Sequence, residues 1–446
     1  MIGIFQYPSM SDELTLSPTQ PEMPAAGDDP GPRWRVRFWA IFGGQASSLI
    51  GSAMTQFVLL WWITDTTGSV SALATAGLAA LLPQALLGPL GGIWADRYSR
   101  RFIMITADMI NALCMLVLIA LFASDRVELW HIYTMMFVRS AMQAFQQPAA
   151  AASTAMLVPQ SFLPRAAGLN QTLYGIMTVA AAPLGALAIS IMPTGTALSI
   201  DVVTAVIGVL PLIVYPIPQR RLLPHQRRGL WQEFTEGVLT VWRNPALRRL
   251  YALMGAVILV IMPSFTLMPL LVKEHFGGGP QHVAIIESLG GVGMIVGGVA
   301  VAAIAPKRRI VWVLAGFALS CFTLAFAALA PGDMFWLAVF WWTVSSIVFI
   351  MGQAPFTTIL QTTVPNELQG RVLSLLGTIM GLAAPVGLAI ATPLGDAIGV
   401  RWLFVSVGIA GGLVSLLGFL SPVVLSIDRS AAFSEQTDTS LKSPRT

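Results

Sequence analysis

The stretch GGIWADRYSRR, residues 91–101, places four charged side chains directly after the apolar run from 72 to 90. Only 10% of the 446 residues are charged, 55% are hydrophobic, and the mean hydropathy is +0.74. A single soluble core cannot bury that much apolar surface. We therefore interpret this stretch as a short loop between two membrane-spanning helices.

Apolar runs long enough to cross a bilayer recur along the whole chain. A spanning helix needs roughly 20 mostly apolar residues, and the sequence contains about twelve such runs. They lie near 37–62, 72–94, 103–124, 129–151, 166–192, 197–218, 248–273, 282–304, 310–330, 334–356, 370–394 and 400–425. The predicted fold is an all-α membrane protein with twelve transmembrane helices.

Basic residues are distributed unevenly among the predicted loops. One alternate set of loops, together with both tails, holds all but four of the 25 Lys and Arg residues. The opposite set holds only Arg126, Lys273 and Arg401, and Arg139 lies within a span. Because basic loops stay on the cytoplasmic side, we expect both termini to be cytoplasmic. The pI near 9.3 then reflects topology, and a nucleic-acid surface is not expected.

A weak internal repeat divides the predicted spans into two halves. A shift of 206 residues superposes Gly91-Gly92 on Gly297-Gly298, Gln147 on Gln353, Val158-Pro159 on Val364-Pro365, and Arg165 on Arg371. The segments AAPLG at 181–185 and AAPVG at 383–387 are also similar. Parallel repeats of this kind build alternating-access transporters with a site between the halves. The sequence thus predicts two pseudo-symmetric six-helix bundles.

The repeat predicts a domain organisation. It consists of a disordered cytoplasmic tail at 1–32, an N-terminal half at 33–218, a cytoplasmic linker at 219–247, a C-terminal half at 248–426 and a cytoplasmic tail at 427–446. Within the linker, Trp231, Phe234, Val238 and Trp242 recur at helical spacing, which favours an interfacial helix over a solvated one. Residues 1–32 are rich in proline and acidic side chains and lack the features of a cleaved signal.

The cysteine and histidine content favours neither an enzyme nor a metal protein. Cys114 and Cys321 both lie in predicted spans, so a disulfide framework is not expected. The four histidines are scattered without metal-ligand or catalytic spacing. We expect no cofactor and no metal.

The charged loop has a recognisable pattern. It reads Gly92-x-x-x-Asp96-Arg97-x-x-Arg100-Arg101. This pattern resembles the signature loop of the major facilitator superfamily, with Ser99 where the family usually has glycine. Glycines permit close helix packing, and a carboxylate is stabilised at the N-terminal end of a helix. The resemblance implies that Asp96 contacts the eleventh span near Gly370 and stabilises the outward-facing state.

One other interpretation of the loop stays open. The arginines of the loop can be topology markers alone, although that leaves Asp96 and the glycines unexplained. We place Asp108, at the start of the third span, in the same gating group, because it is expected to pair with Arg97, Arg100 or Arg101.

Three further segments resemble the bacterial macrolide-efflux branch of the superfamily. They are GGQASSLIGSAMTQ at 43–56, LVKEHFGGGP at 271–280 and GRVLSLLGTIMGLAAPVGLAIATPLGDAIGV at 370–400. The resemblance covers about Arg35 to Phe419 and implies a multi-pass protein of the bacterial inner membrane. The related siderophore-exporter branch shares this architecture, so the class of protein is better defined than the substrate.

Ionisable side chains inside spans are functional candidates because a charge in the bilayer is costly. Arg139 in the fourth span, followed by Gln143, resembles an antiporter motif of this superfamily. Arginine keeps its proton but can hold or release a carboxylate partner. A purely structural buried ion pair is the alternative.

Two carboxylates are the corresponding acidic candidates. Glu287 lies in the outer third of the eighth span, where it could exchange a proton or bind a cationic substrate, and the family resemblance supports an acid there. The alternative is that Glu287 caps a helix at the outer interface. Asp201, just inside the sixth span, is similar but is expected nearer the surface.

The fifth span carries a degraded form of the drug-antiporter motif. Pro183 and Gly185 permit a bend and close helix contact there, whereas Ala182 and Ala186 stand where the family has glycine. Aromatic and thioether side chains such as Tyr174 are candidates for lining an apolar cavity, although most are expected in packing or against lipid.

The sequence therefore predicts a proton-coupled exporter of amphipathic drugs, macrolide-like above all, that works by rocking of two halves. The expected partners are a small amphipathic substrate, protons as the coupling ion and the lipid bilayer, and the chain is expected to be a monomer. The alternatives are an exporter of a siderophore or another anionic metabolite, and a membrane sensor or lipid-handling protein without turnover.

Overall fold

The computed structural model describes residues 31–217, 238–239, 241–363 and 366–425, and every regular element among them is helical. The predicted tail at 1–32 apart from residues 31 and 32, the predicted tail at 427–446 and most of the predicted linker at 219–247 lie outside the described residues. The elements are α1 (Trp34–Thr67), α2 (Val70–Arg97), α3 (Arg100–Ala123), α4 (Leu129–Leu157), η1 (Gln160–Phe162), α5 (Leu163–Ile191), α6 (Thr194–Ala197), α7 (Ser199–Val214), α9 (Pro245–Phe276), α10 (Pro280–Ile304), α11 (Arg309–Leu329), α12 (Phe335–Thr363), α13 (Asn366–Leu417) and η3 (Gly418–Leu420).

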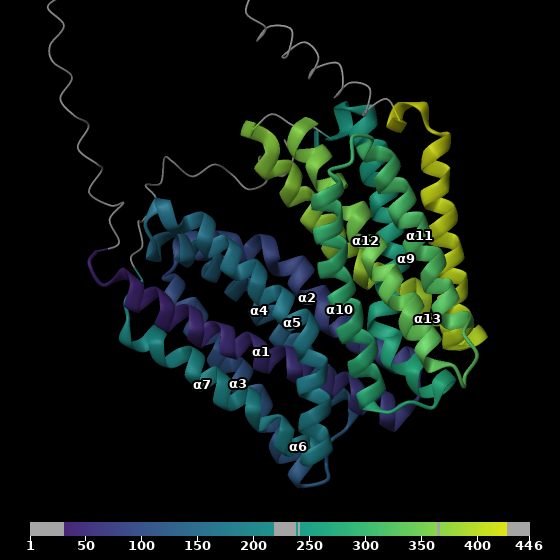
Figure 1. The fold of residues 1–446 in the computed structure, drawn as a ribbon. Helices are drawn as coiled ribbons and strands as arrows, with labels where there is room; N and C mark the ends of the chain where they lie inside the picture. The colour runs from purple at the N-terminus through teal and green to yellow at the C-terminus, as the bar shows by residue number, and fades with distance from the viewer. Residues whose placement is uncertain (1–30, 218–237, 240, 364–365, 426–446) are drawn as a thin grey trace, which may run out of the picture.

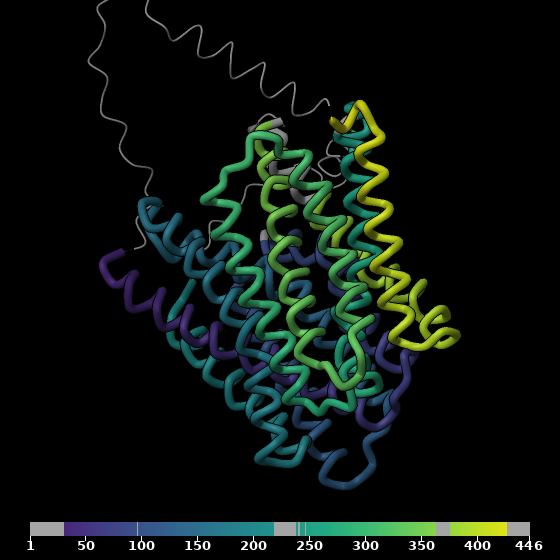
Figure 2. Tube along the Cα trace, turned by 45° about the vertical axis from the view of Figure 1, so that its right-hand side comes forward, coloured from purple at the N-terminus to yellow at the C-terminus, as the bar shows by residue number. Residues whose placement is uncertain are grey.

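The expected twelve crossings are present. In the described part of the chain, ten helical segments are long and apolar enough to span a membrane. One of them, Leu375–Leu420, has 46 residues, about twice the length that one crossing requires. It breaks at Gly399, whose φ is 80°, and the chain turns back there (Figure 2). The twelfth crossing is α4, whose arginine and glutamines make it the most polar of the set.

The helices pack into two groups. Helices α1 to α7 form the N-half and α9 to α13 form the C-half, and most contacts stay within one half. Between the halves, the main seams are α2 with α13 and α5 with α10. Figure 1 shows that the halves meet toward the bottom of the view and separate toward the top.

The sequence repeat corresponds to repeated backbone packing. A Cβ on Gly91 of α2 would collide with the carbonyl oxygen of Ala144 on α4. A Cβ on Gly297 of α10 would collide with the carbonyl oxygen of Ile347 on α12 in the same way. Such close approach is possible only for glycine. The second and fourth helices of each half are therefore held together at equivalent positions.

The AAPLG and AAPVG segments mark a second repeated contact. A Cβ on Gly185 of α5 would lie 2.6 Å from the ring of Phe57 on α1. A Cβ on Gly387 of α13 would collide with the carbonyl oxygen of Leu259 on α9. The first and fifth helices of each half thus approach each other closely at a glycine. This close packing holds the helices of each half together.

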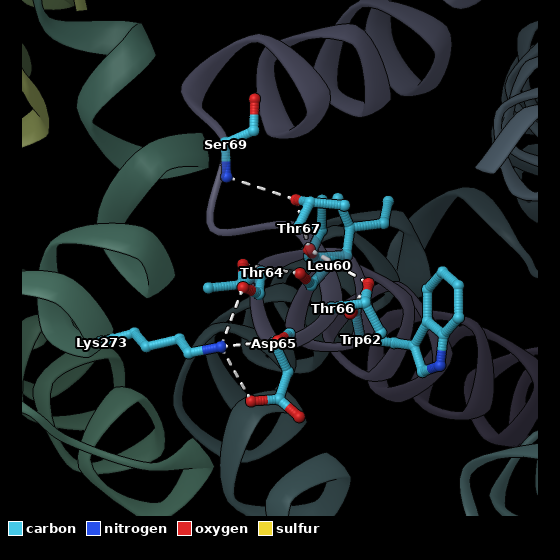
Figure 3. Close-up of polar contacts among 9 residues, drawn as sticks. Leu60, Trp62, Thr64, Asp65, Thr66, Thr67, Ser69 and Lys273 are labelled. Atoms are coloured by element: carbon cyan, nitrogen blue, oxygen red, sulfur yellow. Dashed lines mark hydrogen bonds and ion pairs between the residues drawn. The ribbon is translucent and has the colours of Figure 1, made fainter. Parts of the chain in front are cut away.

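Contacts between the halves lie at one end of the bundle, which we call the closed end. It contains the last turn of α1, the first half of α2, the last turns of α9 and the first turns of α10. Lys273 on α9 donates from Nζ to a carboxylate oxygen of Asp65 at 3.0 Å and to the carbonyl oxygens of Thr64 at 3.2 Å and Asp65 at 2.6 Å (Figure 3). One lysine therefore joins the C-half to the end of α1.

Further contacts seal the closed end. The hydroxyl of Ser288 on α10 donates to the carbonyl oxygen of Val179 on α5 at 2.9 Å. Gly77 on α2 lies so close to Leu388 on α13 that an added Cβ would be 2.7 Å from its side chain. These contacts hold α10 against α5 and α2 against α13.

The opposite end, where α1 begins and α2 ends, is the open end. Five glycines on the seam helices α2, α5 and α13 have no described atom within 4 Å of where a Cβ would be, namely Gly88, Gly92, Gly168, Gly175 and Gly377. Large apolar side chains of α2 are exposed there, namely Leu86, Leu90 and Trp94. The seams that are packed at the closed end are therefore unpacked at the open end.

Candidate functional site

A buried ion pair lies in the N-half. Nη1 of Arg139 on α4 is 3.0 Å from Oδ2 of Asp201 on α7, and the two side chains are 11% and 3% exposed. The hydroxyl of Ser52 on α1 donates to the other carboxylate oxygen at 3.0 Å. Arg139 also contacts the sulfur of Met115 on α3 at 3.2 Å. The pair thus joins all four neighbouring helices at one point.

The position of Asp201 corrects one expectation. Asp201 does not lie near the surface, because the short helix α6 precedes α7 and the first turn of α7 is packed inside the N-half. The contact with Arg139 is an ion pair without an aligned hydrogen bond, since Oδ2 of Asp201 has no hydrogen-bond partner among the described residues. A loosely aligned pair of this kind can separate without breaking a well-formed hydrogen bond.

Asp108 forms a second buried polar cluster, and its expected pairing is wrong. Its carboxylate accepts hydrogen bonds from Nε2 of Gln146 at 2.7 Å, Nε2 of Gln45 at 3.0 Å and the hydroxyl of Ser48 at 3.4 Å. Asp108 is 2% exposed and contacts none of the loop arginines. The reason is rotational: its face of α3 points toward α1 and α4, inside the N-half.

The loop arginines have other partners. Arg100 donates to the carbonyl oxygens of Ala95 at 3.1 Å and Ala152 at 2.9 Å, which fixes the loop on α4. Arg101 donates to the carbonyl oxygen of Ile213 on α7, and Arg97 is exposed. The side chain of Asp96 and those of the first turns of α13 lie outside the described residues, so the implied gating contact stays a prediction.

The glycines and the serine of the loop also have distinct roles. Of the glycines expected to pack closely, Gly91 does so, whereas Gly88 and Gly92 have open space beside them. Ser99, which replaces the usual glycine, is the N-cap of α3, and its hydroxyl accepts a hydrogen bond from the backbone N–H of Phe102. Serine suits this position because its hydroxyl caps the helix and its φ of −62° does not require glycine.

A cavity of about 240 Å³ opens between α1, α4 and α5 toward the open end. Its apolar wall includes Phe38, Phe42, Leu49, Met104, Leu173 and Tyr174. Its polar wall includes five amides, Gln45, Gln143, Gln146, Gln147 and Asn170, together with Ser153 and Thr154. No charged side chain is part of the described lining. The cavity can therefore bind a group that is partly apolar and rich in hydrogen-bonding oxygens.

The amides of this wall differ in their partners. Gln147 accepts a hydrogen bond from Nε2 of Gln84 on α2 at 2.9 Å and is held in place. Gln146 and Gln45 are joined by a bond of 3.3 Å and lie between the cavity and Asp108. Gln143, the predicted coupling residue, has no hydrogen-bond partner among the described residues and remains available to a ligand.

Glu287 faces the interior of the molecule. It shares a face of α10 with Gly290, which packs against α12, and Gly291, which packs against α5. The opposite face of the helix is exposed, as Val292, Val296 and Val299 show. The carboxylate is half-buried and has no ion pair or hydrogen bond to a described residue. Glu287 is thus a carboxylate on the seam side of the C-half without a partner among the described residues.

The capping alternative for Glu287 does not hold. Helix α10 begins at Pro280, and its N-cap Gly279 donates a backbone hydrogen bond to Nδ1 of His282 at 3.1 Å. Glu287 lies two turns further along the helix. The structure does not bring Glu287 into contact with Arg139 or Asp201, which are in the other half.

Pro183 lies beside a second opening. A cleft of about 520 Å³ between α5 and α10 near the closed end is lined by Pro183, Leu187, Ala284, Ile285 and Leu289 among others. Gly185 faces the other way, against α1. Pro183 and Gly185, the two residues of the degraded antiporter motif, therefore lie on different sides of α5.

Sequence reasoning missed Gln45, Ser48 and Ser52. All three are polar residues in the first span, at a spacing that puts them on one face of α1. They contact Asp108 or Asp201. A search for polar residues at helical spacing within spans would have found them.

Comparison with known proteins agrees with this architecture. The model of the Major Facilitator Superfamily matches residues 41–388. Macrolide efflux protein A of Streptococcus pyogenes is 31% identical over 400 residues, which cover 88% of this chain and 97% of that protein. The multidrug efflux pump Tap of Mycolicibacterium fortuitum is 23% identical over 89% of this chain and 97% of that protein.

Solved structures show the same fold. A bacterial homologue of the iron transporter ferroportin in the inward-facing state superposes with a TM-score of 0.71 at 14% identity, covering 89% of this chain and 100% of that chain. The chain is a multi-pass membrane protein and belongs to the major facilitator superfamily of transporters.

Proposed function

We propose that this chain is a proton-coupled exporter of amphipathic compounds, macrolide-like antibiotics above all, and that it works by alternating access. The observation that carries the proposal is the cavity between α1, α4 and α5, with its apolar wall and its wall of amides. The relation to a macrolide efflux protein and to a multidrug efflux pump supports the same substrate class.

The size of the cavity fits one part of a large substrate. Drug-sized sites have volumes of roughly 300–1,000 Å³, and this cavity has about 240 Å³. It would therefore hold one arm of a macrolide, such as a sugar, while the rest lies in the space between the halves. Oxygen-rich sugars match the amides, and methyl groups match the apolar wall.

The proposed orientation places the open end and both termini in the cytoplasm of a bacterium. Basic residues support this orientation, since Arg97, Arg100, Arg101, Arg165, Lys307, Arg308 and Arg309 lie at the open end. Only Arg126, Lys273 and Arg401 lie at the closed end of the described chain. The structure then corresponds to a conformation that accepts substrate from the cytoplasm.

Proton coupling is assigned to Glu287, with Arg139 and Asp201 as a coupled pair in the other half. Glu287 has no described partner and lies on the seam side of α10, so a proton or a substrate can bind it. Protonation from outside would displace the substrate, and release into the cytoplasm would reset the cycle. The membrane potential adds about 2.3 kcal/mol per charge per 100 mV.

The test is accumulation of a labelled macrolide in an efflux-deficient bacterial host. We expect lower accumulation in cells that express the chain, and a protonophore should abolish the difference. Glu287→Gln should abolish it as well, with the variant shown to be present in the membrane. Unchanged proton-driven efflux by Glu287→Gln would remove that residue from the mechanism.

An anionic siderophore is the less favoured substrate. The described lining of the cavity contains no Arg or Lys, and the guanidinium of Arg139 is already paired with Asp201. Efflux of a labelled siderophore without efflux of a macrolide would reverse this ranking. Absence of substrate-dependent proton movement in vesicles would favour a sensor or lipid-handling role.

A further inference from the structure

Asp108 is a buried carboxylate that no basic side chain contacts in the described part of the chain. The helices packed around it supply Gln45 and Ser48 from α1, Gln146 from α4 and the like charge of Asp201 from α7. Arg139 is engaged with Asp201, and no described basic side chain contacts Asp108. Burying an ionised carboxylate is costly, and hydrogen bonds alone compensate that cost only in part. The site therefore favours a positive charge that none of the described residues provides.

The amides of Gln45 and Gln146 separate this carboxylate from the cavity. Both line the cavity, and both donate from Nε2 to Asp108. Nε2 of Gln45 also donates to the carbonyl oxygen of Gly208 at 3.3 Å, and Oε1 of Gln146 accepts no hydrogen bond from a described residue. Rotation of the two side chains would turn their Oε1 atoms toward an incoming donor and expose Asp108. The pair thus forms a removable cover.

We propose that Asp108 is the charge-selecting residue of the cavity and that it binds the basic nitrogen of an amphipathic amine after Gln45 and Gln146 rotate away. The inference rests on the proposed function and specifies its substrate class. The N–H of a protonated amine would donate to the carboxylate of Asp108, and the two amide oxygens would lie near its positive charge, while the apolar wall holds the adjacent carbon skeleton. Neutral analogues would form hydrogen bonds with the amides, but Gln45 and Gln146 would remain hydrogen-bonded to Asp108.

The test compares two ligands that differ in one charge. Erythromycin carries a basic dimethylamino group, and its N-demethyl-N-acetyl derivative is neutral at the same atom. Binding of each to the purified full-length protein is measured by quenching of tryptophan fluorescence. We expect the wild type to bind the amine at least ten-fold more tightly, and Asp108→Asn to reduce that ratio to within two-fold.

Three variants separate the charge from the fold. Asp108→Glu keeps the charge and should retain the preference for the amine. Gln146→Lys places an ammonium group beside Asp108, so the preference should disappear although the carboxylate remains. Asp333→Asn is the matched carboxyl-to-amide control, because Asp333 is exposed between α11 and α12 and does not line the cavity, and it should leave the ratio unchanged. The ratio is also measured in Glu287→Gln. Gln146→Lys keeps the test decisive if Asp108→Asn does not fold.

The outcomes distinguish this inference from the proposed function. Equal binding of both ligands by the wild type, or a ratio that survives in Asp108→Asn and Gln146→Lys, would overturn the role of Asp108 while macrolide recognition stands. A ratio lost only in Glu287→Gln would transfer charge selection to that residue. If neither macrolide binds, the permanently charged tetraphenylphosphonium ion replaces them, and its failure to bind, or its equal binding to Asp108→Asn, would overturn the inference.

Discussion

Lys273 holds Asp65 by its backbone as well as by its side chain. Its ammonium group lies 2.6 Å from the carbonyl oxygen of Asp65 and 3.0 Å from the carboxylate, and it also reaches the carbonyl oxygen of Thr64 (Figure 3). Both carbonyl groups belong to the last turn of α1. The carbonyl oxygen of Thr64 also accepts from the backbone N–H of Gly68, whereas that of Asp65 is an acceptor that the helix end leaves without an intrahelical partner. The C-half therefore caps a helix of the N-half, and the cap exists only while the closed end is shut.

Substitutions of Lys273 and of Asp65 should therefore affect the opening of the closed end unequally. Asp65→Asn removes one charged acceptor from an exposed ion pair, which is worth about 0.2–1 kcal/mol. Lys273→Met removes all three bonds, so it should open the closed end more often. Labelling of Leu388→Cys, which replaces a fully buried residue at the closed end, should accelerate several-fold with Lys273→Met and less with Asp65→Asn. Equal rates in the two variants would show that the backbone bonds contribute nothing.

The ion pair of Arg139 and Asp201 should be more costly to break singly than jointly. Arg139→Gln or Asp201→Asn leaves one buried charge without its partner, which costs about 3–5 kcal/mol. The double variant leaves neither charge and should unfold at a higher temperature than either single variant. Thermal unfolding measured by size-exclusion fluorescence checks the order. Efflux should fail in all three variants, and a double variant that still exports drug would make the pair purely structural.

The two neighbouring glycines of α2 give a matched pair. Gly91→Ala places a methyl group against the carbonyl oxygen of Ala144, and overpacking of this kind costs about 1–3 kcal/mol. Gly88→Ala meets no described atom within 4 Å, and alanine is the better helix former by about 1 kcal/mol. We expect Gly91→Ala to lower the unfolding temperature and Gly88→Ala to maintain it. A similar loss in both would contradict the packing described here.

The number of helices and their type could be predicted from the sequence because the bilayer sets the length of each crossing. The repeat was predictable for a related reason, since glycine is needed wherever two backbones approach. Arg139 was predictable as a residue that needs a carboxylate. Its partner was not, because Asp201 is far away in sequence and only the break between α6 and α7 turns it inward.

The partners of Asp108 were even less predictable from the sequence. Its position near the loop arginines suggested an ion pair, yet its partners come from α1 and α4. Which face of a helix turns inward depends on how the helices pack, and a span that is apolar on most sides carries little sign of that rotation. Polar residues in the first span were the available signal, since Gln45 and Ser48 lie one turn apart.

The glycines at the open end have a further consequence. A Cβ added at Gly88, Gly92 or Gly377 would meet no described atom within 4 Å, so this conformation does not require glycine at these positions. Under alternating access, the same helix surfaces must meet when the open end shuts, and there a methyl group would be in the way. Substitutions at these positions would leave the fold intact and instead change the equilibrium constant between the two conformations. A survey of variants based on stability alone would classify them as neutral, although each would slow turnover.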